Sequence, residues 1–109
     1  MFDVVLTSGF KKELKHIAKK HKSILADVNL LIDQLAKNPT IGNDLGRNVF
    51  KIRLSISSSS KGKSGGARII TYVKIIAQTV ILAEIYLKNE YHTVDMEGII
   101  KRLKQEEFI

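Results

Sequence analysis

The stretch VFKIRLSI, residues 49–56, alternates between large apolar side chains and polar or basic ones. A period of two is typical of a β-strand that is buried on one face only. The apolar set is predicted to face the core and consists of Phe50, Ile52, Leu54 and Ile56. Lys51 and Arg53 are then predicted to lie together on the outer face of the strand.

Two more strands are predicted downstream, ARIITYVKI at residues 67–75 and TVILAEIYLK at residues 79–88. The second is apolar on both faces, which predicts a central place in a sheet. The short link at residues 76–78 favours a hairpin turn, so these strands are predicted to be antiparallel neighbours. Residues 2–6 are short, apolar and β-branched and predict one further strand.

Three helices are predicted from apolar residues spaced three and four apart. The stripe of the first is Phe10, Leu14, Ile17, Ala18 and His21, and that of the second is Leu25, Val28, Leu31, Ile32 and Leu35. Ser23 is the predicted N-cap of the second helix, which Asn38 and Pro39 end. Asp95 is predicted to cap a last helix that buries Met96, Ile99, Ile100 and Leu103. Gly98 is expected to weaken that helix by about 1 kcal/mol.

This element order predicts an α+β fold in one domain that spans all 109 residues. We expect a small twisted antiparallel sheet, with the N-terminal helical hairpin packed on one face and a short C-terminal helix. The order is β-α-α-β-β-β-α.

The charge balance points to a polyanionic or acidic partner. Eighteen Lys and Arg against eleven Asp and Glu give a net charge of +7, which attracts nucleic acid or an acidic protein. No cysteine is present, which suits the reducing cytoplasm where we expect the protein. The first residues lack the pattern of a secretory signal, and no apolar run is long enough for a membrane span.

Three kinds of catalytic or binding site are disfavoured. The GKS of residues 62–64 lacks the first glycine of a phosphate-binding loop, because Ser57 stands there, and a strand rather than a helix is predicted to follow. The three histidines do not have metal-ligand spacing, so no metal site or cofactor is predicted. No G-x-S-x-G or other Ser-His-Asp pattern is present.

A basic face is the remaining candidate site. If the chain folds back through residues 57–66, Arg68 comes beside Lys51 and Arg53, and Tyr72 and Lys74 share the face of Arg68 by their even spacing. Such a patch grips phosphates and offers an aromatic ring on which a base stacks. A merely solvated sheet face explains the spacing equally well.

At these residues the sequence resembles the RelE/HigB toxins of bacterial type II toxin–antitoxin systems, which belong to the RelE/ParE superfamily. The resemblance rests on FKIRLSI, KGKSGGARIITYV, TVILAEIYLKNE and the preceding LIDQLAKNPTIGNDLGRNVFKIRL. It implies a metal-independent endoribonuclease, an mRNA interferase that inhibits translation by cutting mRNA on the ribosome. It also implies a cognate antitoxin as partner, and it leaves the oligomeric state of the free toxin open, with a monomer as one option.

The resemblance assigns roles to individual residues. Lys51 is implied as general base or proton shuttle, since two neighbouring arginines disfavour its ammonium form. Arg53 and Arg68 are implied as the phosphate clamp, and Lys88 matches a basic position after the last strand. The second basic position holds Asn89, and the family's tyrosine position falls near Asp95, so Tyr91 or His92 is expected to supply the general acid. A polar loop before the last helix is the other interpretation of Tyr91 and His92.

Two other functions remain open. One is a non-nuclease toxin similar to the ParE group, which inhibits DNA gyrase. The other is an interaction module without activity, which the Asn89 departure favours. The stretch SSSSKGKSGGAR, residues 57–68, is interpreted as a long hairpin loop. Its Lys61 and Lys63 either reach RNA or are simply solvated.

Overall fold

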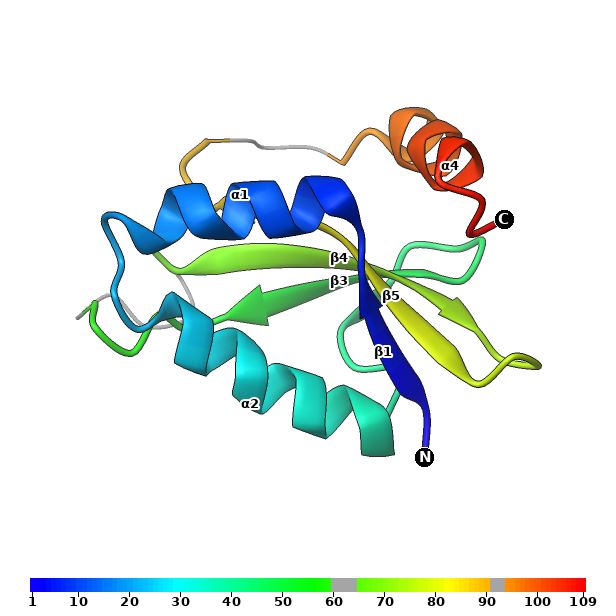
Figure 1. Cartoon of the computed structure of the whole chain (residues 1–109), viewed down its shortest axis with the longest axis horizontal. Coiled ribbons are helices and arrows are strands. Elements are labelled where there is room, and N and C mark those ends of the chain that lie inside the picture. Colours follow the sequence, from blue (N-terminus) through cyan, green and yellow to red (C-terminus); the bar gives the residue numbers. More distant parts are fainter. Residues whose placement is uncertain (60–64, 91–93) are drawn as a thin grey trace.

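The structure, a computed structural model, describes residues 1–59, 65–90 and 94–109. Its elements are β1 (Asp3–Leu6), α1 (Ser8–Ala18), α2 (Ile24–Lys37), β2 (Asn43–Asp44), β3 (Val49–Leu54), β4 (Ala67–Lys74), β5 (Thr79–Leu87) and α4 (Met96–Gln105). The predicted helices and strands are all present, and among the elements described the two-residue β2 had not been predicted. The α+β class and the predicted order of elements are confirmed (Figure 1).

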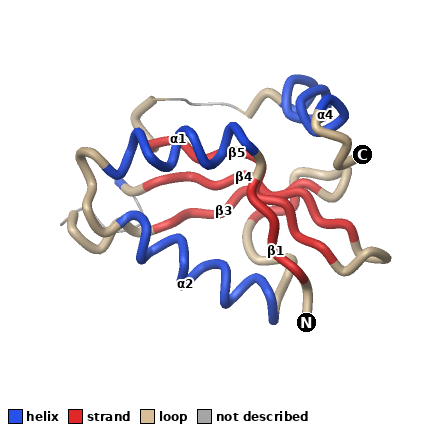
Figure 2. Tube along the Cα trace, in the orientation of Figure 1, coloured by secondary structure: helices blue, strands red, loops and turns tan. Residues whose placement is uncertain are grey.

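The strands form one five-stranded sheet in the order β1-β5-β4-β3-β2, drawn as one twisted surface in Figure 2. Strands β3, β4 and β5 pair antiparallel, as predicted, and the additional β2 pairs antiparallel to β3. Strand β1 is the exception, because it pairs parallel to β5, with Val4 opposite Val80. This pairing places β5 between two strands, which confirms its predicted central position and explains its apolar residues on both faces.

Helices cover the two faces of the sheet unequally. Helices α1 and α2 lie together on one face (Figures 1 and 2), where Phe10 and Leu35 belong to the larger apolar cluster with Ile52 and Ile69. Helix α4 packs on the opposite face, where Leu103 joins the smaller cluster. The buried α4 residues of this cluster are Ile99, Ile100 and Leu103, with Met96 only partly buried, and they pack against Val49, Ile70, Ile81 and Tyr86 of the sheet. The second face is therefore only partly covered.

The start of α2 differs from the prediction in two ways. Ile24 is fully buried whereas Leu25 is 49% exposed, so the apolar stripe begins one residue earlier than predicted. Ser23 holds the N-cap position but makes no side-chain cap. Its backbone is helical, at φ −81° and ψ −7°, whereas a capping side chain needs an extended backbone, as at Thr7 with φ −70° and ψ 163°.

The hydroxyl of Ser23 joins a network around Asp27, which is only 6% exposed on α2. Asp27 accepts hydrogen bonds from the Ser23 hydroxyl at 2.8 Å and from the Ser57 backbone at 2.9 Å, and also from the Ser57 hydroxyl. The Ser58 backbone donates to the Ser23 hydroxyl at 2.8 Å. The beginning of the serine stretch is therefore fastened to α2.

Asp95 caps α4 as predicted, by accepting a hydrogen bond from the Gly98 backbone at 3.1 Å. Gly98 has a role beyond the weakening expected for it, because a Cβ atom there would collide with the Asp95 carboxylate. The glycine leaves room for the cap that begins the helix.

A β-bulge divides β5 and reverses the direction of its side chains. Ile70 lies opposite Glu84 and Thr71 opposite Leu82, so Ala83 is the extra residue. Before the bulge Leu82 faces α1 and α2, and after it Ile85 takes the same face, three residues later instead of two. Glu84 and Tyr86 are thereby directed to the opposite face, which carries Arg68.

Candidate nucleic-acid interface

The strand register places three polar side chains in one row across the sheet. Arg53 of β3 lies directly opposite Arg68 of β4, and Arg68 lies opposite Tyr86 of β5. The neighbouring row consists of Lys51, Ile70 and Glu84. Side chains paired in this way on one face lie about 5 Å apart at their Cβ atoms. The fold therefore brings Lys51, Arg53 and Arg68 together, and we call them the basic triad.

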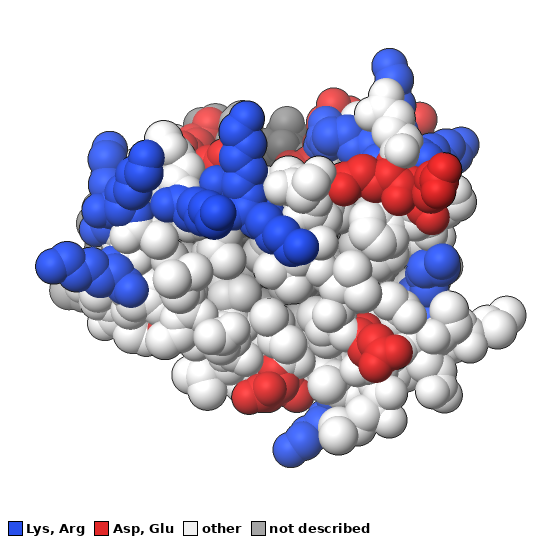
Figure 3. Space-filling view, viewed as in Figure 1, with Lys and Arg blue, Asp and Glu red and all other residues white. Residues whose placement is uncertain are grey.

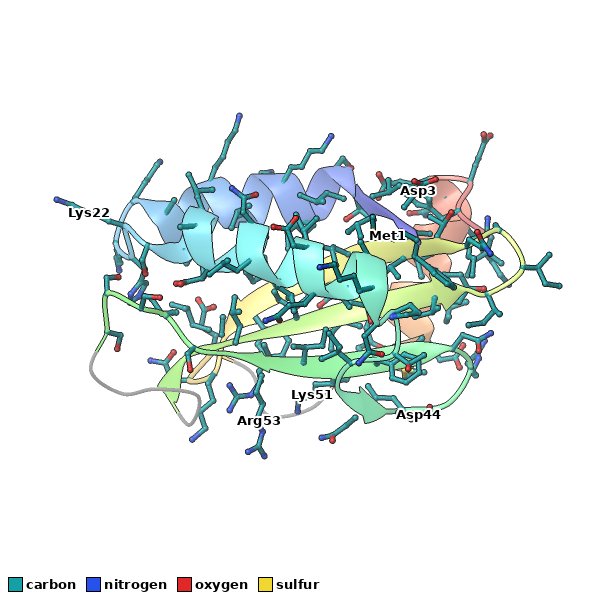
Figure 4. The ribbon with its side chains drawn as sticks, turned by 90° about the horizontal axis from the view of Figure 1, so that it is seen from below. Met1, Asp3, Lys22, Asp44, Lys51 and Arg53 are labelled. Atoms are coloured by element: carbon teal, nitrogen blue, oxygen red, sulfur yellow. The ribbon has the colours of Figure 1, made fainter. Side chains whose placement is uncertain are left out.

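The members of the basic triad differ in exposure. Lys51 and Arg53 project from the side of the sheet opposite α1 and α2 (Figure 4), with Arg53 exposed and Lys51 half-buried. Arg68 is only 6% exposed, and its guanidinium donates a hydrogen bond to the Ala67 carbonyl at 3.1 Å. Arg53 and Lys51 are therefore the accessible members of the basic triad, and Arg68 lies beneath the surface.

Tyr86 is a site residue that the sequence interpretation missed. It is 5% exposed and lies beside Arg68. Burial raises the pKa of Tyr86 above the usual value of a phenol, Glu84 raises this pKa further, and Arg68 acts in the opposite direction. The phenol therefore keeps its proton at neutral pH, and a protonated phenol is able to donate a hydrogen bond. Tyr86 could have been assigned to the face of Arg68 only with knowledge of the bulge at Ala83, because strict alternation from Ile81 places its side chain on the face under α1 and α2.

Helix α4 forms the border of the site. Arg102 makes an ion pair with Glu84, which belongs to the Lys51 row. Arg47, in the link before β3, pairs with Glu97 at 2.9 Å. Glu106 accepts hydrogen bonds from the backbone and the hydroxyl of Ser8, at 3.1 and 2.9 Å. These contacts and the smaller apolar cluster hold α4 against the sheet.

The other predicted residues are distributed unevenly. Lys88 is exposed, and its backbone donates to the Gly66 carbonyl at 3.0 Å, so it lies at the Arg68 end of the sheet. Tyr72 lies opposite Val49 and Ile81 and packs against the cluster under α4. It is four residues along the strand from Arg68, about 13 Å. Lys74 lies still farther away, opposite Thr79. The structure does not bring Tyr72 and Lys74 to the triad.

Four predicted residues, Lys61, Lys63, Tyr91 and His92, lie outside the described residues. Asp95, near the family's tyrosine position, is used as the cap of α4. Asn89 is exposed beyond the end of β5. Within the described chain, Tyr86 is therefore the neutral side chain with a transferable proton that lies beside Arg68 of the triad.

No three His, Asp or Glu side chains in residues 1–59, 65–90 and 94–109 gather as they would around a metal ion. In the same residues, no helix has the length and apolar character needed to cross a membrane.

Comparison with known proteins gives a likeness of fold and not of sequence. No protein-family model matches the sequence, and no curated protein matches it significantly. The crystal structure of the isolated E. coli RelE toxin matches with a TM-score of 0.61 and 14% sequence identity, over 94% of this chain and 99% of that one. The chain therefore has a RelE-like fold.

Proposed function

We propose that this protein is the toxin of a type II toxin–antitoxin system and cleaves mRNA on the ribosome, as a metal-independent endoribonuclease. The observation that carries the proposal is the basic triad. Its three residues come from the adjacent strands β3 and β4 and lie on the part of the sheet that α4 leaves open. The RelE-like fold supports it. This function requires a cognate antitoxin and ribosome-bound mRNA as partners, and acts in the cytoplasm.

The proposed reaction is attack of a ribose 2′-OH on the adjacent phosphate. The 2′ proton passes to a base, a 2′,3′-cyclic phosphate forms, and the leaving 5′-oxygen takes up a proton. A phosphorane with spread negative charge lies between substrate and product. Preorganised cations that stabilise this charge contribute several kcal/mol to catalysis.

The accessible residues suit these steps. Arg53 is exposed and permanently charged, so it binds the phosphate with a planar fork of donors. Lys51 lies two residues away on the same face and is the candidate for moving the 2′ proton. Arg68 lies behind them as a buried positive charge. Tyr86 lies in the same row with a protonated hydroxyl, and the proton for the leaving group comes from it or from Tyr91 or His92.

The test is to express the wild type and single Lys51→Ala, Arg53→Ala and Arg68→Ala variants and to map mRNA 5′ ends after induction. New 5′ ends should appear with the wild type and become at least tenfold rarer with each variant, because each removes charge from the transition state. Lys37→Ala is the control, since Lys37 is exposed at the end of α2 on the other side of the sheet.

Growth arrest without new 5′ ends would overturn the nuclease. Inhibition of gyrase supercoiling by the purified protein in that case would support the ParE-like function. Full toxicity of Arg53→Ala with unchanged cleavage would separate the triad from the activity.

A further inference from the structure

A second basic surface lies on α1. Six lysines in the helix and the turn after it are exposed, namely Lys11, Lys12, Lys15, Lys19, Lys20 and Lys22. Figure 3 shows a band of basic side chains over this helix. Residues 8–22 contain a single carboxylate, Glu13. We call these six residues the α1 ridge.

The lysines of the α1 ridge follow the axis of the helix. Lys11, Lys15 and Lys19 are four residues apart, so they form a line with a rise of about 6 Å per step. A row of regularly spaced cations of this kind suits the regularly spaced phosphates of a nucleic-acid backbone. A shallow hollow beside it is lined by Lys12 and His16 together with these lysines.

Helix stability accounts for only some of these positions, because Lys15 and Lys19 lie at the C-terminal end of α1, where the helix dipole favours cations. Like charges four residues apart destabilise a helix by about 0.2–0.5 kcal/mol per pair. Lys11 and Lys12 lie near the N-terminal end, where the helix dipole disfavours cations, and the first turn contains no acidic residue. The salt bridges found among the described residues are Arg47–Glu97 and Arg102–Glu84, so neither neutralises the ridge. Its charge remains available to a partner.

The α1 ridge and the basic triad lie on opposite sides of the sheet. Helix α1 packs on one face through Phe10, Leu14 and Ile17, whereas Lys51 and Arg53 project from the other face (Figure 4). A single-stranded segment bound at the triad cannot lie along α1 at the same time. The partner of the ridge is therefore a different segment or a different molecule.

The chemistry of the ridge favours a duplex. Single-stranded nucleic acid is bound by cations together with exposed aromatic rings, and residues 11–22 contain no Phe, Tyr or Trp. A membrane surface is disfavoured, because an interfacial helix inserts its apolar face into lipid and the apolar face of α1 is buried against the sheet. Lysines without aromatic neighbours suit a regular phosphate backbone.

We propose that the α1 ridge binds the phosphate backbone of double-stranded RNA, separately from the RNA strand at the basic triad. The choice of RNA over DNA rests on the proposed function. The protein then lies between two RNA segments, with a structured one on the helical side and a single-stranded one on the open side of the sheet. This arrangement holds the toxin on a folded RNA while the triad engages a flexible strand.

The test compares two triple variants of equal charge. Lys11→Gln, Lys15→Gln and Lys19→Gln are combined in the first, and the control combines Lys37→Gln, Lys101→Gln and Lys104→Gln, all exposed and outside the ridge. Binding of a fluorescent 20-base-pair RNA duplex is measured by anisotropy over a range of KCl concentrations. The slope of log affinity against log salt should fall by about 2–3 in the ridge variant, near 0.9 for each lost phosphate contact, and by less than 1 in the control.

Folding is checked on both variants by circular dichroism and thermal melting. The ridge variant should melt no lower than the wild type, because two like-charge pairs are removed. Equal losses of duplex binding in the two variants, or no loss in the ridge variant, would overturn the proposal. Tighter binding of a DNA duplex than of the RNA duplex would overturn the choice of RNA. Because the binding assay does not depend on cleavage, the proposal for the α1 ridge and the proposal of a nuclease are tested independently, and either can be refuted while the other stands.

Discussion

Asp27→Asn should destabilise the protein more than an average substitution of a charged residue on a helix. The carboxylate accepts hydrogen bonds from the Ser57 backbone at 2.9 Å, from the Ser57 hydroxyl and from the Ser23 hydroxyl at 2.8 Å. An asparagine keeps the shape but loses the charge and turns an NH2 group toward one of these donors. A hydrogen bond to a charged group contributes about 1.5–3 kcal/mol, so we expect a loss of about 2 kcal/mol in the free energy of unfolding.

Urea unfolding measures this loss. With a slope of about 2 kcal/mol per M for a domain of this size, the midpoint should fall by about 1 M. Asp33→Asn is the matched control, because Asp33 is exposed on the same helix, and its effect should stay within about 0.5 kcal/mol. Equal midpoints for the two variants would refute the view that the network fastens the serine stretch to α2.

The pH dependence has a definite sign. Burial raises the pKa of Asp27, but the hydrogen bonds donated by the Ser57 side chain, the Ser57 backbone and Ser23 together outweigh it, so the pKa lies below the usual aspartate value. A lowered pKa in the folded state stabilises the protein above the unfolded-state pKa, and this contribution is lost as the pH falls through the folded-state pKa. The stability difference between wild type and Asp27→Asn should be constant above about pH 5 and shrink below it. A difference that grows on acidification would contradict this assignment.

Three further predictions concern the sheet. Tyr86→Phe should lower the cleavage rate about tenfold, which corresponds to ~1.4 kcal/mol in the activation free energy, and should leave KM unchanged, because it removes only the hydroxyl beside Arg68. A parallel fall in melting temperature would indicate that the hydroxyl has a purely structural role. Thr71→Val should raise the free energy of unfolding by about 1 kcal/mol in urea titrations, because the Thr71 hydroxyl is buried without a hydrogen-bond partner in the described structure. A loss of stability would show instead that this hydroxyl makes a hydrogen bond. Gly42→Ala should lower the free energy of unfolding by more than about 1 kcal/mol, because Gly42 has φ +106° and a Cβ there would lie 2.5 Å from the Lys51 carbonyl oxygen. Gly9→Ala is the control, since a Cβ at Gly9 would meet no atom within 4 Å. Equal losses of stability in the two variants would refute the clash.

The alternation of β3 was predictable because one face of the strand packs against the helices and the other face is more open, so successive side chains meet different surroundings. Its apolar residues, such as Ile52, face α1 and α2, and Arg53 faces away. The antiparallel pairing of β3 with β4 then fixes Arg68 opposite Arg53. Local periodicity and one reversal of the chain are enough to place the basic triad.

The features that escaped prediction depend on contacts between distant segments. The bulge at Ala83 is invisible in the sequence, because its carbonyl accepts a hydrogen bond from the Thr7 hydroxyl at 3.2 Å, 76 positions away. The four-residue β1 contains nothing that sets its direction, so its parallel pairing with β5 could not be predicted. The burial of Ile24 instead of Leu25, by contrast, follows from local spacing, because Ile24 lies on the same face of α2 as the buried Val28, Leu31 and Leu35.

The burial of Arg68 bears on why the site has this form. A guanidinium taken out of water costs several kcal/mol unless it is well paired, and an apolar residue of similar volume is often no less stabilising. Arg68 nevertheless occupies the middle position of a row that begins with the exposed Arg53 and ends with the buried Tyr86. Strands hold these groups more rigidly than a loop would, and a buried charge is screened little by solvent, so its field at Arg53 and Lys51 is stronger than that of an exposed lysine. In the proposed cleavage reaction such a fixed field stabilises the charge that develops on the phosphate, which is a physical reason for an arginine at this buried position.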